Sequence, residues 1–151
     1  MNADIYERLR HNPIFVHLDR YMFQMVEKRL VFRQLEPNEY LFLEGEHGDT
    51  MAFVLHGELN IIKKNSQGTP TVIHRMHAGD SIGEMALLDE LTRSASVQAT
   101  QLSALVLLSR QDFEQILVDY PQTGIAMLRG VATMLSLNLR RTSEDLSRSM
   151  G

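Results

Sequence analysis

The feature that most constrains the fold is a central region, residues 30–109, in which short apolar segments alternate with glycines. The segments, such as MAFVLHG, ELNIIKK and LSALVLL, are rich in aliphatic and β-branched residues, and six glycines interrupt them: Gly45, Gly48, Gly57, Gly68, Gly79 and Gly83. Short segments of this kind between turn residues predict strands joined by tight turns. Their number and close spacing predict a small antiparallel barrel or sandwich.

Helical patterns flank this region on both sides. Before it, Asp19 stands at a capping position ahead of a run with apolar residues three and four apart. After it, residues 110–120 form an amphipathic pattern, and Pro121 suits the first turn of a helix that extends to about Ser149, about 40 Å away. We therefore predict one mainly β domain of the α+β class over residues 1–151, with N-terminal helices in 1–29, strands in 30–109 and C-terminal helices in 110–149.

Composition excludes several classes of protein. The 151 residues are 44% hydrophobic and 23% charged, with a net charge of -4, which disfavours a domain that holds nucleic acid by charge alone. The absence of cysteine excludes disulfides, thiolate metal sites and cysteine nucleophiles. The six histidines are scattered, so we expect no metal site, and no nucleophile stands beside a plausible base, so we expect no enzyme. Neither a signal peptide nor a membrane span is visible, and we expect a cytoplasmic protein.

The last helical segment carries an uninterrupted apolar seam. Its members alternate three and four apart: Ile125, Leu128, Ala132, Leu135, Leu139, Thr142 and Leu146. This spacing is typical of a coiled coil. A second stripe of Met127, Val131 and Met134 flanks only the first half. We expect the helix to pack on its own domain early and to pair with a second copy along the seam, making a homodimer. The alternative is one long helix lying on its own domain.

A further pattern is GDSIGEMALLDELTRSASVQAT, from Gly79 to Thr100. It combines glycines, which leave the backbone uncovered by side chains, with the oppositely charged side chains of Glu84 and Arg93. An ionised Glu84 only accepts hydrogen bonds, which suits a sugar hydroxyl, whereas Arg93 offers a planar set of donors for a phosphate. Gly83 permits close backbone approach, and Ser94 adds a hydroxyl beside the arginine. A phosphorylated ribose would satisfy all these groups.

Two structural explanations compete with a binding site. Ser81 and Glu84 have the spacing of a capping box, in which Glu84 merely closes the start of a helix. Arg93 is near enough in sequence to pair with Asp89 or Glu90 on the surface, where ion pairs contribute little. Taken residue by residue, these explanations are the more economical ones, so the pattern has to be considered as a unit.

As a unit, GEMALLDELTRSASVQA resembles the phosphate-binding cassette of the cyclic nucleotide-binding domain family, the module of catabolite activator proteins, cyclic-nucleotide-dependent kinases and gated channels. The cassette spans residues 79–95, and its matching positions are Gly83, Glu84, Ala86, Leu87, Leu88, Arg93, Ser94 and Ala95. Upstream, FLEGEHGDTMAFVLHGELNI resembles the family's roll, with Gly45, Gly48, Gly57 and Glu58 in place. The resemblance covers nearly the whole chain and implies an antiparallel eight-stranded β-roll or jelly roll, with a hinge helix from about Arg110 and a long final helix.

The resemblance also implies residue roles. Glu84 would accept the ribose 2′-hydroxyl, and Arg93 would pair with the cyclic phosphate. Ser94 and the backbone N–H groups around Met85 and Ala86 would assist Arg93, while aliphatic side chains lining the roll would contact sugar and purine. Those two side chains are Ile61 and Ile73. Thr92 departs from the family's usual proline before the arginine, which would loosen the loop without removing a ligand contact.

The identity of the purine follows less directly. In the activator proteins the last helix supplies polar groups to the base, and the residues in corresponding places here are Asn138, Arg141 and Thr142. Ser94 suits either purine. We favour cyclic AMP over cyclic GMP on the family as a whole.

The expected function is therefore a non-catalytic sensor that binds a cyclic nucleotide, needs no cofactor or metal, and reports the ligand by moving its C-terminal helices. No helix-turn-helix, kinase or channel segment follows the last helix, so the output would pass through a dimer or a downstream protein partner. Two alternatives remain: a regulatory fragment of a larger transcription factor, and a dimerisation or interaction module of the same fold that binds no nucleotide.

Overall fold

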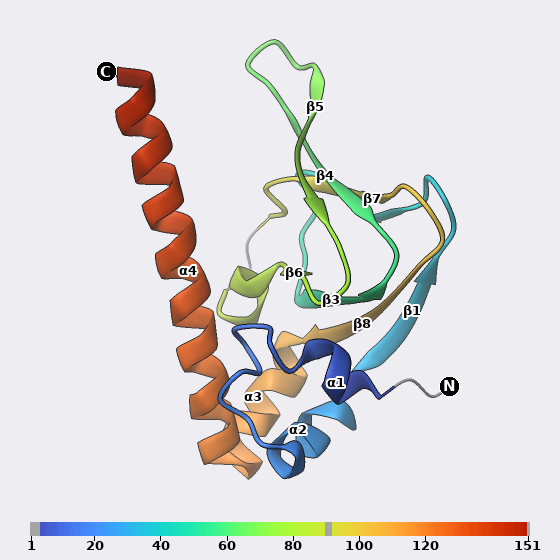
Figure 1. Ribbon diagram of the computed structural model, residues 1–151, viewed down its shortest axis with the longest axis vertical. Helices are drawn as coiled ribbons and strands as arrows, with labels where there is room; N and C mark the ends of the chain where they lie inside the picture. Colours follow the sequence, from blue (N-terminus) through green and yellow to red (C-terminus); the bar gives the residue numbers. More distant parts are fainter. Residues whose placement is uncertain (1–3, 90–91, 151) are drawn as a thin grey trace.

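A computed structural model describes residues 4–89 and 92–150 of the chain. In this part of the chain, eight strands form two four-stranded sheets, with helices at both ends of the sequence (Figure 1). The strands are β1 (Val31–Leu35), β2 (Tyr40–Phe42), β3 (Thr50–His56), β4 (Leu59–Lys64), β5 (Pro70–Met76), β6 (Ser81–Ile82), β7 (Ser96–Ala99) and β8 (Ser103–Ser109).

The sheet topology confirms the predicted antiparallel roll. One sheet has the order β1-β8-β3-β6 and the other β2-β7-β4-β5, and every pairing is antiparallel. Strands β1 to β5, β7 and β8 match, to within one residue at their ends, apolar segments of the central region, residues 30–109. Strand β6 has two residues, too few to show any alternation of apolar and polar side chains, which explains why no segment predicted it.

Strand β3 joins two separate apolar cores because both of its faces are buried. Met51 and Phe53 point into a core shared with the helices, whereas Ala52 and Val54 point into the interior of the roll. This division follows from the period of two along a strand. In the helical core, Phe53 packs against Phe15 with ring centroids 4.8 Å apart. The helices therefore pack directly against the β1-β8-β3-β6 sheet, on the face that points away from the interior of the roll.

The two N-terminal helices, α1 (Ile5–Leu9) and α2 (Arg20–Glu27), cover this face (Figure 1). Asp19 caps α2 as predicted, since its carboxylate accepts a hydrogen bond from the N–H of Met22 at 2.8 Å. Asp4 caps α1 in the same way through Tyr6. Both caps are acidic residues at the positive end of a helix dipole.

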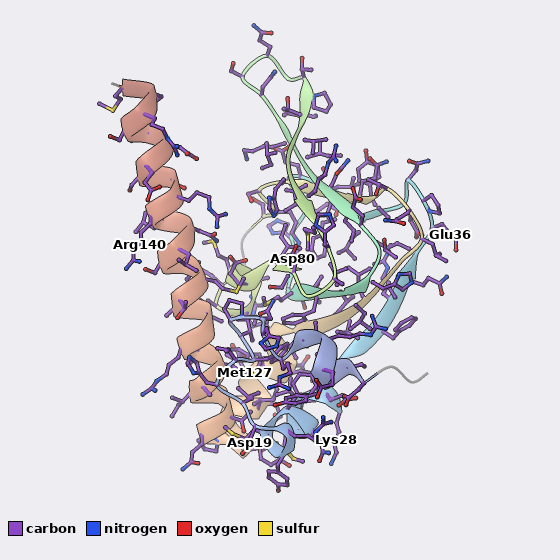
Figure 2. All side chains as sticks on the ribbon, in the orientation of Figure 1. Asp19, Lys28, Glu36, Asp80, Met127 and Arg140 are labelled. Atoms are coloured by element: carbon purple, nitrogen blue, oxygen red, sulfur yellow. The ribbon has the colours of Figure 1, made fainter. Side chains whose placement is uncertain are left out.

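The C-terminal helices are α3 (Arg110–Asp119) and α4 (Pro121–Met150), and α4 begins at the predicted proline. Its first half is held tightly: Met127 and Val131 are buried, and Gly130 lies against the backbone of Pro13 and Ile14. Residues 136–150 are exposed, and this half stands clear of the roll in Figure 1. Met127 lies on the side of α4 that faces the other helices, whereas Arg140 lies on the side away from the roll (Figure 2).

The predicted seam of α4 is divided between two environments. Leu128 and Leu135 pack partly against the chain's own helical core. Ile125, Leu139 and Leu146 are each more than half exposed. The flanking stripe of Met127, Val131 and Met134 packs on the domain, as predicted. The seam is therefore open for a partner over most of its length.

Candidate functional site

A cavity of about 800 Å³ opens between the roll, the short helix η1 (Glu84–Leu87) and α4. The polar and charged side chains in its wall come from these three parts of the fold and from the N-terminal segment. From the roll and its loops come His74, Asp80, Ser81, Thr92, Arg93 and Ser94; from η1, Glu84; from α4, Asn138 and Arg141; from α1 and the segment after it, Arg8, His11 and Asn12. The cavity thus collects most of the residues that the sequence singled out, together with others that it did not.

The start of η1 depends on Gly83. Its backbone is left-handed, with φ 92°, a conformation that favours glycine, and η1 begins immediately after it. The capping-box interpretation of Ser81 and Glu84 is wrong, because Gly83 occupies the capping position and no side chain caps this helix. The Ser81 hydroxyl instead accepts a hydrogen bond from Asn12 at 2.9 Å. Glu84 is thereby left at the first position of η1, in the cavity wall.

Arg93 lies flat in a slot formed by three neighbours. The centre of its guanidinium is 3.5 Å from the ring centroid of Phe42, a cation–π contact. One terminal nitrogen donates to the hydroxyl of Thr50 at 3.1 Å. On another side the guanidinium touches the backbone of Gly48 so closely that a Cβ there would overlap it. Arg93 is thus positioned by residues distant in sequence and does not extend freely into solvent.

The electrostatics of this slot favour an anionic ligand. Burial lowers the pKa of Arg93, because removal from water disfavours the charged form, while the carboxylates of Asp49 and Glu46 act in the opposite direction. A negative group bound in the cavity would offset the same cost. The guanidinium contacts Thr50 and Phe42, and of the two surface partners considered from the sequence, Glu90 lies outside the described residues.

Glu84 has a partner on α4. The side-chain amide of Asn138 donates a hydrogen bond to Oε1 of Glu84 at 2.9 Å, joining residues 54 apart in sequence. Met85 and Ala86 also line the cavity. The N–H of Ala86 is already donated to the carbonyl of Gly83 at 2.9 Å, so the backbone donors expected here reduce to those earlier in η1. Ser94 is exposed at the rim, and its carbonyl accepts from Lys63 at 2.6 Å.

The apolar wall differs from the predicted one at one position. Ile61 lines the cavity, but Ile73 is 56% exposed and does not. The register explains the difference: Ile61 pairs with His74 and Ile62 with Val72, so a β-bulge leaves Ile73 without a partner opposite it. His74 takes the place in the wall that we had assigned to Ile73. A bulge has no signature in a single apolar segment, so the sequence did not reveal it.

The three residues proposed for the base have different locations. Asn138 and Arg141 line the cavity, whereas Thr142 does not. The Thr142 hydroxyl donates to the carbonyl of Asn138, within the helix, at 2.9 Å. Among the described residues, no group of three or more histidine, aspartate or glutamate side chains has a geometry for a metal ion. In the same part of the chain, no helix is both long and apolar enough to cross a membrane.

Comparison with known proteins identifies this arrangement. The family model of the cyclic nucleotide-binding domain matches residues 32–120, more than half of the chain. The chain belongs to the cyclic nucleotide-binding domain family. The match contains both Glu84 and Arg93, while α4 lies beyond it.

The chain is similar to proteins of different kinds. The potassium/sodium hyperpolarization-activated cyclic nucleotide-gated channel 3 of Mus musculus is 31% identical over 137 residues, which are 91% of this chain and 16% of the channel. A cyclic nucleotide-binding domain of Methylobacillus flagellatus is 25% identical with a TM-score of 0.84, over 96% of this chain and 83% of that one. The N-terminal domain of a transcriptional regulator of Streptomyces coelicolor is 27% identical with a TM-score of 0.79, over 95% of both chains.

This chain thus spans about a sixth of the channel's length, and it is similar both to part of a channel and to the N-terminal domain of a transcriptional regulator. Membership in the family gives the fold and the general class of ligand. The choice of ligand and the output have to be argued from the site itself.

Proposed function

We propose that this chain is a non-catalytic sensor that binds a cyclic nucleotide, with cyclic AMP favoured over cyclic GMP, and couples the ligand to its C-terminal helices. One observation carries the proposal: Glu84 and Arg93, with opposite charges, line the same cavity beside Gly83. A cyclic nucleotide offers a hydroxyl and a single negative phosphate on one small sugar. An acceptor and a planar donor group in one cavity match these two groups.

Each wall of the cavity then has a role. Glu84 accepts the ribose 2′-hydroxyl, and Arg93 binds the phosphate with help from Ser94 and from the N–H of Met85. Ile61 and His74 border the sugar and base, and Asn138 and Arg141 offer polar groups to the purine. Because Thr142 lies outside the lining of this cavity, a purine contact from it would have to reach the cavity of a second copy.

The coupling runs through η1, which contributes to the cavity and to the helical core at once. Leu87 is buried in that core with Phe113, Ile116 and Met127, whereas Leu88 is 48% exposed. When the phosphate draws Arg93 and the cassette inward, Leu87 changes its packing against α3 and α4. The ligand shifts this equilibrium only as far as it binds one arrangement better than the other.

The exposed seam of α4 supports a homodimer as the form of the protein that transmits the movement of the C-terminal helices. Exposed apolar side chains at coiled-coil spacing on a helix of 30 residues are suited to pair with a second copy. A downstream protein partner and a cytoplasmic location remain predictions of the sequence. A second candidate, a dimerisation module that binds no nucleotide, is favoured by this same seam.

Calorimetric titration with cyclic AMP and cyclic GMP tests the proposal. We expect micromolar or tighter binding of cyclic AMP and weaker binding of cyclic GMP. Arg93→Ala should weaken binding about 10–100-fold, because a charged hydrogen bond contributes about 1.5–3 kcal/mol. The matched control is Arg75→Ala, which removes an exposed arginine outside the cavity wall and should leave affinity unchanged. Equal affinity in the Arg93 variant and its control would refute the site, and no binding of either nucleotide would favour the dimerisation module.

A further inference from the structure

We propose that Asn138 competes with the ribose hydroxyl of the ligand for Glu84, and thereby sets how strongly the site distinguishes ribose from deoxyribose. The inference rests on the proposed function, since it assumes that Glu84 receives the hydroxyl. It assigns to an α4 residue a role in specificity that its place in the sequence does not reveal.

The geometry of the contact fixes its chemistry. An ionised carboxylate has no hydrogen to donate, so the NH₂ group of the Asn138 amide is the donor and Oε1 of Glu84 the acceptor, at 2.9 Å. A ribose hydroxyl would also have to donate to this carboxylate. The two donors therefore seek the same acceptor, and the amide already occupies one of its oxygens.

The contact is also the outermost attachment of α4 to the rest of the domain. Within the described chain, the other side-chain hydrogen bonds of α4 remain inside the helix. Met134 and Leu135 are the last α4 side chains packed against the helical core, and every later residue described is exposed. Asn138 lies one turn beyond them, where little else holds the helix, so the amide can be displaced without unpacking the core.

Disturbing the bond between Asn138 and Glu84 costs free energy only for ligands that carry a 2′-hydroxyl. A nucleotide with a 2′-hydroxyl has to share the carboxylate with the Asn138 amide. The amide either shifts to make room or stays and withdraws charge from the same acceptor, so part of the gain is lost. A 2′-deoxy nucleotide has no hydroxyl to place there and leaves the amide where it is. Asn138 therefore reduces the advantage of ribose over deoxyribose.

The test compares cyclic AMP with 2′-deoxy cyclic AMP by titration of wild type and Asn138→Ala. We expect the ratio of the two affinities to rise about 3–10-fold in the variant, as a partly exposed charged hydrogen bond is removed from competition. Any contact of Asn138 with the base is common to both ligands and cancels from the ratio. Ser136→Ala, an exposed substitution on the same helix outside the cavity wall, is the control and should leave the ratio unchanged. A ratio that stays the same or falls in Asn138→Ala overturns the inference.

A second variant separates this inference from the proposed function. Glu84→Ala should bring the ratio close to one whether residue 138 is asparagine or alanine. If Glu84→Ala abolishes the discrimination but Asn138→Ala does not increase it, competition is refuted and the ribose site stands. If Glu84→Ala leaves the discrimination intact, or wild type binds neither nucleotide, the ribose assignment fails and the inference fails with it.

Discussion

At the scale of single residues, the phosphate-binding candidate Arg93 is positioned by groups far from it in sequence. Phe42 supplies a ring face, Thr50 a hydroxyl and Gly48 a surface without a side chain. The backbone of Arg93 is held as well, since its N–H donates to the carbonyl of Glu46 at 2.6 Å. These contacts limit the orientations of the guanidinium before a ligand binds, which reduces the entropy lost on binding.

This arrangement predicts that Gly48→Ala weakens cyclic AMP binding about tenfold although no ligand contact is deleted. The new Cβ would overlap the guanidinium, which is the flexible end of a side chain, so Arg93 moves and the fold is retained. Calorimetry measures the affinity, and circular dichroism checks the fold. The double variant Gly48→Ala with Arg93→Ala should bind no more weakly than Arg93→Ala alone, because both changes act on one group. Additive losses would contradict the role given to Gly48.

At the scale of elements, α4 is divided by its packing. Around Gly130 the helix touches the segment between α1 and α2 so closely that a Cβ would overlap the carbonyl oxygen of Pro13 and lie 2.6 Å from the Cα of Ile14. Both obstacles are backbone atoms, which cannot rotate away. The first half of α4 is thus held against the segment between α1 and α2, and we expect movement of α4 on ligand binding to be larger in its second half.

Gly130→Ala should therefore destabilise the domain by about 1–3 kcal/mol, the usual cost of overpacking. The sign is the informative part, because glycine to alanine inside a helix ordinarily stabilises by about 1 kcal/mol. Urea denaturation followed by circular dichroism gives the free energy of unfolding. Ser136→Ala, on the exposed half of the same helix, is the control and should change it by less than about 0.5 kcal/mol. A stabilised Gly130 variant would show that α4 is not held at this point.

At the scale of the whole molecule, the exposed seam of α4 bears on whether the protein acts as a monomer or as a dimer. Leu139 is 68% exposed and Leu146 58% exposed, although both are large apolar side chains. Leu135, which belongs to the same seam, already packs partly on its own domain. Leu139 is therefore the better residue for testing pairing between copies without disturbing the fold.

Leu139→Glu should convert the proposed dimer into a monomer, since it places a charge at the centre of an apolar interface. Light scattering after size exclusion measures the mass. Leu137→Glu makes the same chemical change on the same helix but off the seam, and it should leave the dimer intact. If wild type is monomeric with and without cyclic AMP, or the Leu139 variant stays dimeric, this interface is refuted.

Much of this molecule was predictable because its signals are local. Glycines between short apolar segments predicted a small antiparallel barrel or sandwich, which the family resemblance specified as a roll, and Pro121 with the pattern after it predicted α4. Charge and hydrogen-bonding capacity made Glu84 and Arg93 candidates, and the resemblance of the whole segment to a phosphate-binding cassette selected them over the structural explanations. The cap of α2 by Asp19 follows the same logic, because a cap depends only on residues a few positions away.

The wrong predictions arose where long-range contacts outweighed local patterns. Ser81 and Glu84 match a capping box, but Ser81 pairs with Asn12, and the positive φ of Gly83 starts the helix two residues later. The assignment of Ile73 to the wall failed because a bulge gives that place to His74. In both cases a partner remote in sequence decided the outcome.

The sequence by itself determined which groups are candidates for binding an anion with a hydroxyl, and that Glu84 and Arg93 belong to one glycine-framed segment. Only the tertiary structure decided what surrounds them: the slot of Phe42, Thr50 and Gly48 around Arg93, and the amide of Asn138 on Glu84. Local patterns encode backbone conformation and side-chain chemistry. Contacts between residues tens of positions apart depend on how the two sheets and α4 pack together, which no short pattern records.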